Sequence, residues 1–312
     1  MSTNTSPSDT ASARPVWLIA GPTASGKSAC ALQLAKALGK QAQTAVIINA
    51  DSMQLYADIP VLSAAPSEDE LKQCEHRLYG AWDGAVACSA ANWATHAKAE
   101  IEEAHQAGKT PILVGGTGMY LKVLLEGIAP IPAIEPEVRD QVRSLETADA
   151  YAALQIEDPL RADVLEPGDS QRIARALEVK RSTGVTLADW QQAKSGGIGE
   201  EVTLHPLVMM PERQWVYDRC DTRFEKMLAN GAVEEVETLL GRGLSADLPV
   251  MRAIGVPEIA AMIRGELTRE EAISAGGQAT RQYAKRQFTW LRNQCPEDWK
   301  RIAPDEIAEN LP

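Results

Sequence analysis

The sequence predicts an α/β fold in which a doubly wound parallel sheet is interrupted by a smaller, mostly helical domain. Two observations support this prediction. Short apolar runs alternate with helical segments through much of the chain, a pattern typical of strands that helices bury on both faces. A proline-broken stretch near the middle then contains helical segments without an apolar strand run. With 312 residues, 45% of them apolar, the chain is long enough to form a full core.

Four apolar runs are the predicted strands. They are residues 16–20, 45–50, 111–114 and, nearly continuous, 204–210. The segments 28–38 and 93–106 have a helical pattern, and each is followed by a glycine, Gly39 or Gly108, which is a common helix stop. Strands separated by such helices predict parallel pairing.

Changes in proline and glycine content and in the helical pattern along the chain predict the domain boundaries. Prolines between 130 and 136 and a glycine-rich loop at 195–199 enclose the helical stretch. Helices are expected again after Pro211, with breaks at Asn230-Gly231, at 241–243 and at Gly276-Gly277. The expected units are a flexible tail at 1–15, a core formed by 16–128 and 200–312, and an insertion at 129–199.

Composition limits the compartment and the partners. The five cysteines are odd in number and scattered, and neither they nor the four histidines have a metal-binding spacing. We therefore expect a reducing cytoplasm and no zinc site. No apolar stretch is long enough to cross a bilayer, so no membrane association is expected. The net charge of −12 argues against a polyanionic partner, but residues 281–292 are basic and contain no acid, and local charge decides where a polyanion binds.

The strongest motif lies between the first predicted strand and the helix that follows it. Its residues are Gly21, Pro22, Thr23, Ala24, Ser25, Gly26, Lys27 and Ser28, which fit the phosphate-binding P-loop pattern. Backbone N–H groups and the helix N-terminus would bind phosphate oxygens, Lys27 would neutralise a terminal phosphate and Ser28 would ligate Mg²⁺. A chance glycine-rich turn is the alternative. The motif specifies phosphates, not a reaction.

Asp51 directly follows the second predicted strand. Ligands of an open parallel sheet bind beyond the carboxyl ends of its strands, so Asp51 should face the same crevice as the P-loop. A carboxylate there could accept a proton from an attacking nucleophile. An ordinary helix N-cap is the alternative, and the sequence leaves both open.

The third predicted strand ends in Gly115-Gly116-Thr117-Gly118. Glycines at this point would allow a ligand to approach closely, and the Thr117 hydroxyl could bond a phosphate oxygen or the attacking amine. Alternatively, Thr117 caps the next helix.

Arg219 and Arg223 are one helical turn apart after Pro211, so they share a face. Two guanidinium groups on one face could bind a diphosphate. A solvated face balanced by the nearby acids Asp218, Asp221 and Glu225 is the alternative.

These motifs resemble, in the same order, those of bacterial tRNA dimethylallyltransferases. The resemblance extends from about residue 16 to residue 292. It rests on the P-loop, on Asp51-Ser52-Met53-Gln54 with Tyr56, on the Gly115–Thr117 motif with Tyr120, on Asp169-x-Gln171-Arg172-x-x-Arg175, and on the segment 281–292. The last segment is highly specific.

The resemblance implies an activity. Such enzymes transfer the dimethylallyl group of dimethylallyl diphosphate to N6 of adenosine-37, beside the tRNA anticodon, after the adenine has been flipped out of its stack. It implies that Asp51 is the general base and that Thr117 and Arg219 take part in the reaction. Residues 23–28 and Arg223 would bind the diphosphate together with Mg²⁺.

The resemblance also implies partners and RNA contacts. The tRNA anticodon stem-loop and dimethylallyl diphosphate are the expected partners, and we expect a monomer whose insertion contacts the tRNA. The implied tRNA-binding residues are Asp51, Ser52, Met53, Gln54, Thr117, Arg139, Gln171, Arg172, Ile173, Ala174, Arg175, Arg281, Gln282, Lys285, Arg286 and Gln287.

Two departures from the family pattern stand out. Residues 61–66 lack a lysine that most relatives carry, so we expect no phosphate contact from that loop. Residues 253–257 replace a more usual Gly-Tyr-Arg, which weakens any transferred RNA contact there.

Three alternatives remain open at this point. A P-loop small-molecule or nucleotide kinase would consume ATP but leaves the basic segment 281–292 without a role. A non-catalytic RNA-binding protein would not need Asp51. An isopentenyltransferase acting on free AMP would need neither the helical insertion nor the basic segment.

Overall fold

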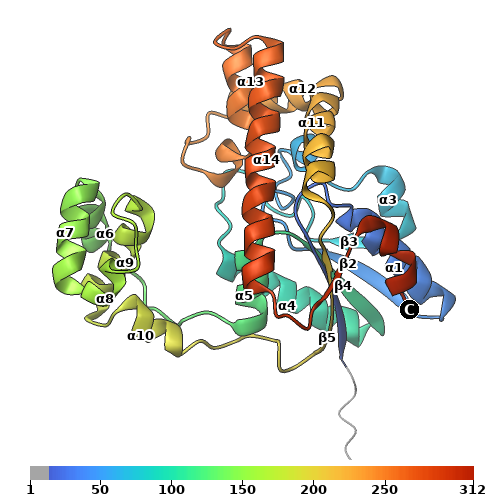
Figure 1. Ribbon diagram of the computed structural model, residues 1–312, viewed down its shortest axis with the longest axis horizontal. Helices are drawn as coiled ribbons and strands as arrows, with labels where there is room; N and C mark the ends of the chain where they lie inside the picture. Colours follow the sequence, from blue (N-terminus) through green and yellow to red (C-terminus); the bar gives the residue numbers. More distant parts are fainter. Residues whose placement is uncertain (1–13) are drawn as a thin grey trace, which may run out of the picture. The chain divides into compact units, whose positions relative to one another are not determined.

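The computed structural model describes residues 14–312 (Figure 1). The expected tail at 1–15 lies outside the described residues except for Arg14 and Pro15, and Pro15 begins the first strand. None of the helices in the described part of the chain is both long and apolar enough to cross a bilayer.

A six-stranded, all-parallel sheet forms the centre of the main unit, in the order β3-β2-β4-β1-β5-β6. The strands are β1 (Pro15–Ala20), β2 (Thr44–Asn49), β3 (Glu75–Arg77), β4 (Lys109–Gly115), β5 (Thr203–Met209) and β6 (Lys300–Ile302). The four predicted strands are confirmed, and so is the doubly wound P-loop fold, since β1 lies between β4 and β5.

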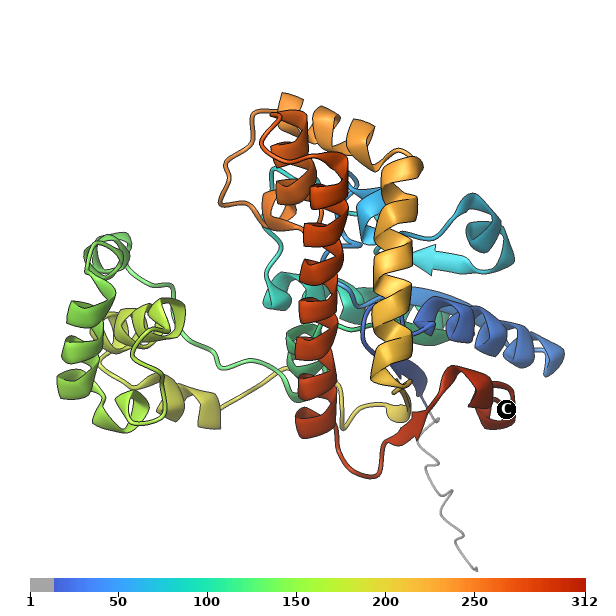
Figure 2. The same cartoon turned by 45° about the horizontal axis from the view of Figure 1, so that its top comes forward.

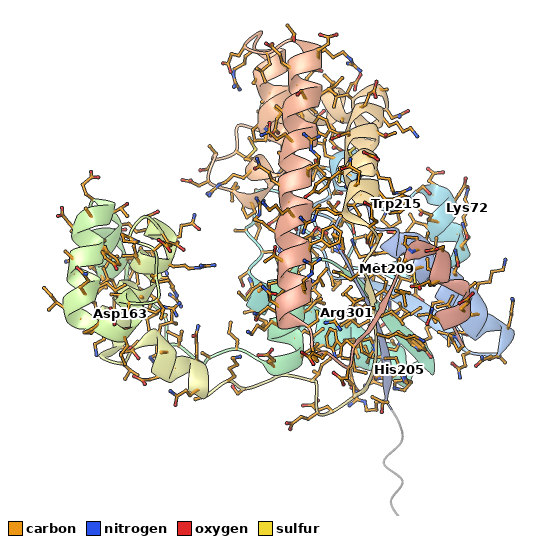
Figure 3. All side chains as sticks on the ribbon, viewed as in Figure 1. Lys72, Asp163, His205, Met209, Trp215 and Arg301 are labelled. Atoms are coloured by element: carbon orange, nitrogen blue, oxygen red, sulfur yellow. The ribbon has the colours of Figure 1, made fainter. Side chains whose placement is uncertain are left out.

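The strands β3 and β6 were not predicted. Each has three residues, mostly charged, and each lies at an edge of the sheet, where β6 pairs with β5 through Val208 and Arg301. Figure 3 shows Met209 and Arg301 at this edge. A short edge strand is exposed on one side and has no apolar run, so sequence patterning does not detect it.

Helices cover both faces of the sheet. The helices of this unit are α1 (Lys27–Lys40), α2 (Pro60–Ser63), α3 (Glu68–Gln73), α4 (Ala90–Gln106), α5 (Gly118–Glu126), α11 (Arg213–Ala229), α12 (Ala232–Gly241), α13 (Val256–Ile263) and α14 (Arg269–Gln294), with 3₁₀ turns η1 (Pro249–Arg252), η2 (Pro304–Glu306) and η3 (Ala308–Asn310). Leu34 of α1 packs with Ile47 and Ile112 of the sheet in one core cluster. The next strand residues, Ile48 and Leu113, are buried on the opposite face, because side chains alternate along a strand.

Two glycine positions correct expectations about helix ends. Gly39 does not stop α1, which continues to Lys40. Gly276 and Gly277 lie inside α14, which runs beside α11 (Figure 2). A Cβ at Gly276 would lie 2.1 Å from Cζ of Phe224 on α11, so the missing side chain allows the two helices to pack closely instead of breaking one of them.

The second unit comprises residues Leu125–Ile198, against the expected 129–199. Its helices are α6 (Pro136–Arg143), α7 (Thr147–Glu157), α8 (Pro159–Ala162), α9 (Ser170–Thr183) and α10 (Leu187–Gln192). The earlier start has a physical reason: Gly127 packs against the backbone of Ser195, and Ile128 pairs with Ser195 in an antiparallel bridge. The core of this unit includes Leu154 and Ile173.

Candidate active site

Three loops meet at the carboxyl edge of the sheet. β2, β4 and β1 are adjacent and parallel, with Asn49 opposite Val114 and Ala20 opposite Gly115. The chain leaves these strand ends as the Asp51 loop, the Thr117 loop and the P-loop. Strand order therefore brings the three predicted motifs together.

The P-loop has the geometry of an anion-binding turn. Ala24 and Gly26 have positive φ values of 61° and 91°, which turn the chain sharply before α1 begins at Lys27. The Gly21 N–H donates to the carbonyl of Gly115 at 3.3 Å. The buried Ser25 Oγ has no hydrogen-bond partner in the described part of the chain, so the loop retains polar groups for a ligand.

Lys27 is held under this loop, where its Nζ donates to the carbonyl of Pro22 at 2.7 Å. Burial lowers the pKa of Lys27 to about 8, while the nearby Asp51 carboxylate opposes this change and Arg223 adds to it. Keeping Lys27 protonated in this position costs free energy, and a bound anion would reduce that cost.

The Asp51 carboxylate is oriented by its neighbours. The buried Asn49 accepts from the N–H of Asp51 at 2.8 Å and donates to its carbonyl at 2.9 Å. One carboxylate oxygen, Oδ1, accepts from the N–H of Met53 at 3.0 Å. Asp51 is therefore part of an Asx turn and not a helix N-cap, and the turn fixes the direction of the carboxylate. Asn49 was not predicted as a site residue, because its bonding role depends on these contacts.

The two arginines of α11 face the P-loop. Arg223 donates to the hydroxyl of Thr23, and Arg219 donates through Nε to the carbonyl of Ala24 at 3.0 Å. Arg219 also lies 4.5 Å above the ring of Trp215, and burial lowers the pKa of Arg223.

Two of the nearby acids have partners other than this pair. Asp218 accepts from Gln214 and Asp221 accepts from Arg281, while the two arginines bond to the P-loop. Arg223 is half-buried, whereas Arg219 is exposed, as the alternative of a solvated face expects.

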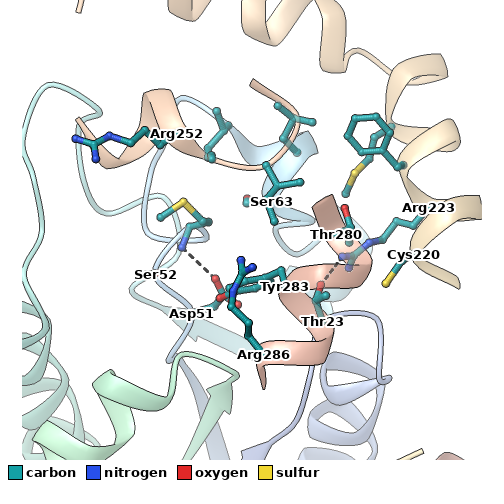
Figure 4. A pocket seen from close by; sticks show the side chains of 17 residues that line it. Thr23, Asp51, Ser52, Ser63, Cys220, Arg223, Arg252, Thr280, Tyr283 and Arg286 are labelled. Atoms are coloured by element: carbon teal, nitrogen blue, oxygen red, sulfur yellow. Dashed lines mark hydrogen bonds between the residues drawn. The ribbon is translucent and has the colours of Figure 1, made fainter. Parts of the chain in front are cut away.

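A cavity of about 240 Å³ is lined by both Asp51 and Arg223. Figure 4 shows Asp51 beside Tyr283 and Arg286, with Arg223 and Thr23 close by. The wall also includes apolar side chains. The lining residues are Thr23, Asp51, Ser52, Met53, Ile59, Leu62, Ser63, Cys220, Arg223, Phe224, Met227, Arg252, Ala253, Ile254, Thr280, Tyr283 and Arg286.

Many of the residues that line the cavity were not predicted from the sequence. An apolar residue that faces a cavity has the same sequence pattern as one that packs against a helix. The examples are Ile59, Leu62, Phe224 and Met227. Tyr283 carries a detectable signal, since it is an aromatic residue three positions before Arg286 in the basic segment.

The glycines at and after the end of β4 allow close packing within the protein itself. A Cβ at Gly115 would lie 2.0 Å from the carbonyl oxygen of Ala50, and one at Gly118 would lie 2.2 Å from the ring of Trp290. A Cβ at Gly116 would lie 2.4 Å from Nε2 of Gln287. These positions are glycine because the chain itself fills the space.

Thr117 is occupied by protein partners instead of standing in the cavity wall. Its Oγ1 accepts from the N–H of Ser52 at 3.0 Å and lies 3.4 Å from Oγ of Ser52. Its backbone carbonyl accepts from the N–H of Leu121 at 3.3 Å, so it stands at the start of α5. The side chain therefore supports the Asp51 loop.

The predicted RNA contacts of the main unit divide into two groups. Gln282, Lys285 and Arg286 are exposed on α14. Gln287 is only 5% exposed and bonds two backbone groups, so a tRNA contact is wrong for this residue. Gln54 donates to the carbonyls of Ser63 and Ala64, and this bond holds α2 in place.

In the second unit, Arg139, Gln171 and Arg172 are exposed and Arg175 is half-buried. Ile173 is fully buried in the core of this unit, and Ala174 packs beside it. A direct tRNA contact is therefore wrong for Ile173: it lies on the inner face of α9, and its neighbours Gln171 and Arg172 lie on the outer face.

No group of three or more histidine, cysteine or acidic side chains that could hold a metal is found within residues 14–312. The Ser28 hydroxyl is exposed in the first turn of α1, next to Lys27. A hard cation that keeps most of its waters and takes its other ligands from a phosphate fits such a site.

Comparisons with known proteins show the family of this chain. The family model described as IPP transferase matches residues 54–294. A tRNA dimethylallyltransferase of Erythrobacter litoralis is 61% identical over 95% of this chain and 93% of its own length. A crystal structure of the full-length tRNA isopentenylpyrophosphate transferase of Bacillus halodurans has a TM-score of 0.66 at 29% identity and covers 95% of this chain and 94% of that one. A eukaryotic dimethylallyltransferase solved acting on tRNA has a TM-score of 0.76 at 28% identity, covering 89% of this chain and 69% of that one. The chain therefore belongs to the IPP transferase family, together with the bacterial tRNA dimethylallyltransferases.

Proposed function

We propose that this chain transfers the dimethylallyl group of dimethylallyl diphosphate to N6 of adenosine-37 of tRNA and releases diphosphate. One observation carries the proposal: a single cavity is lined both by the Asp51 carboxylate and by Thr23 and Arg223, which hold the phosphate-binding side of the site. A base and a diphosphate site that share one small cavity suit a displacement at a carbon lying between them.

Asp51 is the proposed general base. A neutral aromatic amine is a weak nucleophile, so a carboxylate at hydrogen-bond distance assists its attack. The N6–carbon bond forms, the carbon–oxygen bond to the diphosphate breaks, and the N6 proton passes to the carboxylate of Asp51. Its Asx turn with Met53 leaves the second carboxylate oxygen to meet the amine.

The leaving diphosphate develops negative charge, which nearby cations stabilise. Lys27, Arg219 and Arg223 would supply these cations, together with the N–H groups of Ala24 to Ser28. Mg²⁺, held by Ser28 and by diphosphate oxygens, would share the charge. Arg219 and Arg223 already bond the loop itself, so they would be in place when the ligand binds.

The tRNA anticodon stem-loop is the proposed acceptor, and adenosine-37 would be flipped out to reach the cavity. In the main unit, the proposed RNA contacts are three exposed residues of α14: Gln282, Lys285 and Arg286. Arg139, Gln171, Arg172 and Arg175 are the proposed contacts of the second unit. Because the tRNA pool is cytoplasmic, we place the enzyme there, and we propose a monomer.

The decisive experiment offers labelled dimethylallyl diphosphate with Mg²⁺ to an unmodified anticodon stem-loop and to AMP in parallel. We expect label in the stem-loop alone. Label in AMP alone would indicate an isopentenyltransferase of free nucleotides, and label in neither would end the proposal. A parallel incubation with ATP in which the terminal phosphoryl group is transferred to AMP would indicate a kinase.

Asp51→Asn is the matched variant, because the amide keeps an oxygen for the N–H of Met53 and removes only the basic group. We expect kcat to fall at least about 100-fold, while tRNA affinity measured by filter binding stays unchanged. Normal turnover by this variant would show that Asp51 is not the base.

A further inference from the structure

We propose that Gln287 is a positioning residue that fixes the diphosphate side of the site against the base. The inference rests on the proposed function, and it replaces the tRNA contact that the motif implied. The side chain is 5% exposed on α14, and nothing in the described reaction uses it directly.

The Gln287 amide bridges two loops. Its Oε1 accepts from the N–H of Thr23 in the P-loop at 2.7 Å, and its Nε2 donates to the carbonyl of Gly116 after β4 at 2.9 Å. One group has to accept and the other has to donate, so a primary amide satisfies both, whereas a carboxylate or an apolar side chain does not. Gly116 provides the space, since a Cβ there would lie 2.4 Å from Nε2.

The bridge continues to the base. The residue after Gly116 is Thr117, whose Oγ1 accepts from the N–H of Ser52, next to Asp51. A line of bonds thus runs from the Thr23 backbone through Gln287 and the Gly116–Thr117 segment to the Asp51 loop. Because the three bonds are 2.7–3.0 Å long and the bond to Gly116 is buried, this line sets the separation between the diphosphate and the base.

The bond to Gln287 also occupies the N–H group of Thr23. The diphosphate would therefore be bound by the later N–H groups of the P-loop. Arg223, which donates to the Thr23 hydroxyl, depends on the same placement. Displacing Thr23 should therefore disturb the geometry of transfer more than the binding of either substrate, since a misplacement of about 1 Å can cost about 100-fold in rate.

The test compares Gln287→Met, which keeps the size and removes both bonds, with Gln278→Met, an exposed position on the same helix. Both are assayed with labelled dimethylallyl diphosphate and an anticodon stem-loop. We expect kcat of Gln287→Met to fall about 10- to 100-fold, with dissociation constants for both substrates within about threefold of wild type. Unchanged kcat, or a loss confined to tRNA affinity, would overturn the proposal.

Gln287→Glu gives an independent readout, including for the case in which the methionine variant does not fold. A protonated glutamic acid can donate to the carbonyl of Gly116, whereas a carboxylate repels it. Its activity relative to wild type should therefore rise as the pH falls, and a ratio that does not change with pH would contradict the bridge. Wild type and Gln278→Met must transfer label in the same assay. If they do not, it is the proposed function that fails, and not the bridge.

Discussion

The charge of Lys27 should destabilise the folded protein without ligand, although the same charge favours the binding of an anion. Burial lowers its pKa from 10.5 to about 8. This difference corresponds to a cost of about 3 kcal/mol for keeping Lys27 protonated at pH 7. Lys27→Met removes the charge at similar size but loses the bond to the Pro22 carbonyl, worth about 1.5 kcal/mol.

The net expectation is that the free energy of unfolding of Lys27→Met is about 1.5 kcal/mol higher than that of wild type at pH 7, which raises Tm by about 4 °C. The advantage depends on pH in a defined direction. Below about pH 8 the lysine is protonated in both states and the full cost applies. As the pH rises from there to 10.5, the folded protein releases a proton that the unfolded chain keeps, so the cost of the charge declines. The variant then becomes the less stable protein, because the bond to the Pro22 carbonyl is still missing.

Differential scanning calorimetry across this pH range is the assay, with Lys36→Met, an exposed position on the same helix, as the control. Saturating pyrophosphate with Mg²⁺ should cancel or reverse this advantage, because binding the wild type about 10- to 100-fold more tightly stabilises it by about 1.4–2.7 kcal/mol more. A variant that is no more stable than wild type at pH 7 would refute the reasoning that burial makes this cation costly.

Two further predictions concern α11 and α14. Arg223→Gln and Arg219→Gln should each weaken diphosphate binding about 10- to 100-fold, since each removes a charged donor from beside the P-loop. The inhibition constant of pyrophosphate measures this effect. An unchanged inhibition constant would show that these arginines are not part of the site. Gly276→Ala should lower the unfolding free energy by about 1–2 kcal/mol, because its Cβ would lie 2.1 Å from the α11 ring and overpacking outweighs the better helix propensity of alanine. A urea titration that shows a more stable variant would mean that the two helices separate without cost.

The fold and the motifs were predictable where local pattern carries the information. The four long strands are continuous apolar runs, and the P-loop spacing is a property of eight consecutive residues. Parallel strand order then places Asp51 and the P-loop at one edge of the sheet. The short, charged strands at 75–77 and 300–302 have no such pattern, since they are held by pairing with a neighbour.

Sequence by itself therefore determined the P-loop, four strands of the sheet and the resemblance to the family, because glycine spacing and apolar runs are local. Only the tertiary structure decided the contacts of Gln287, whose two partners lie 264 and 171 residues away along the chain. It alone also showed that the glycine at 276 joins two helices where a break was expected. Which face of a helix meets a distant loop depends on packing, and packing is a property of the whole chain.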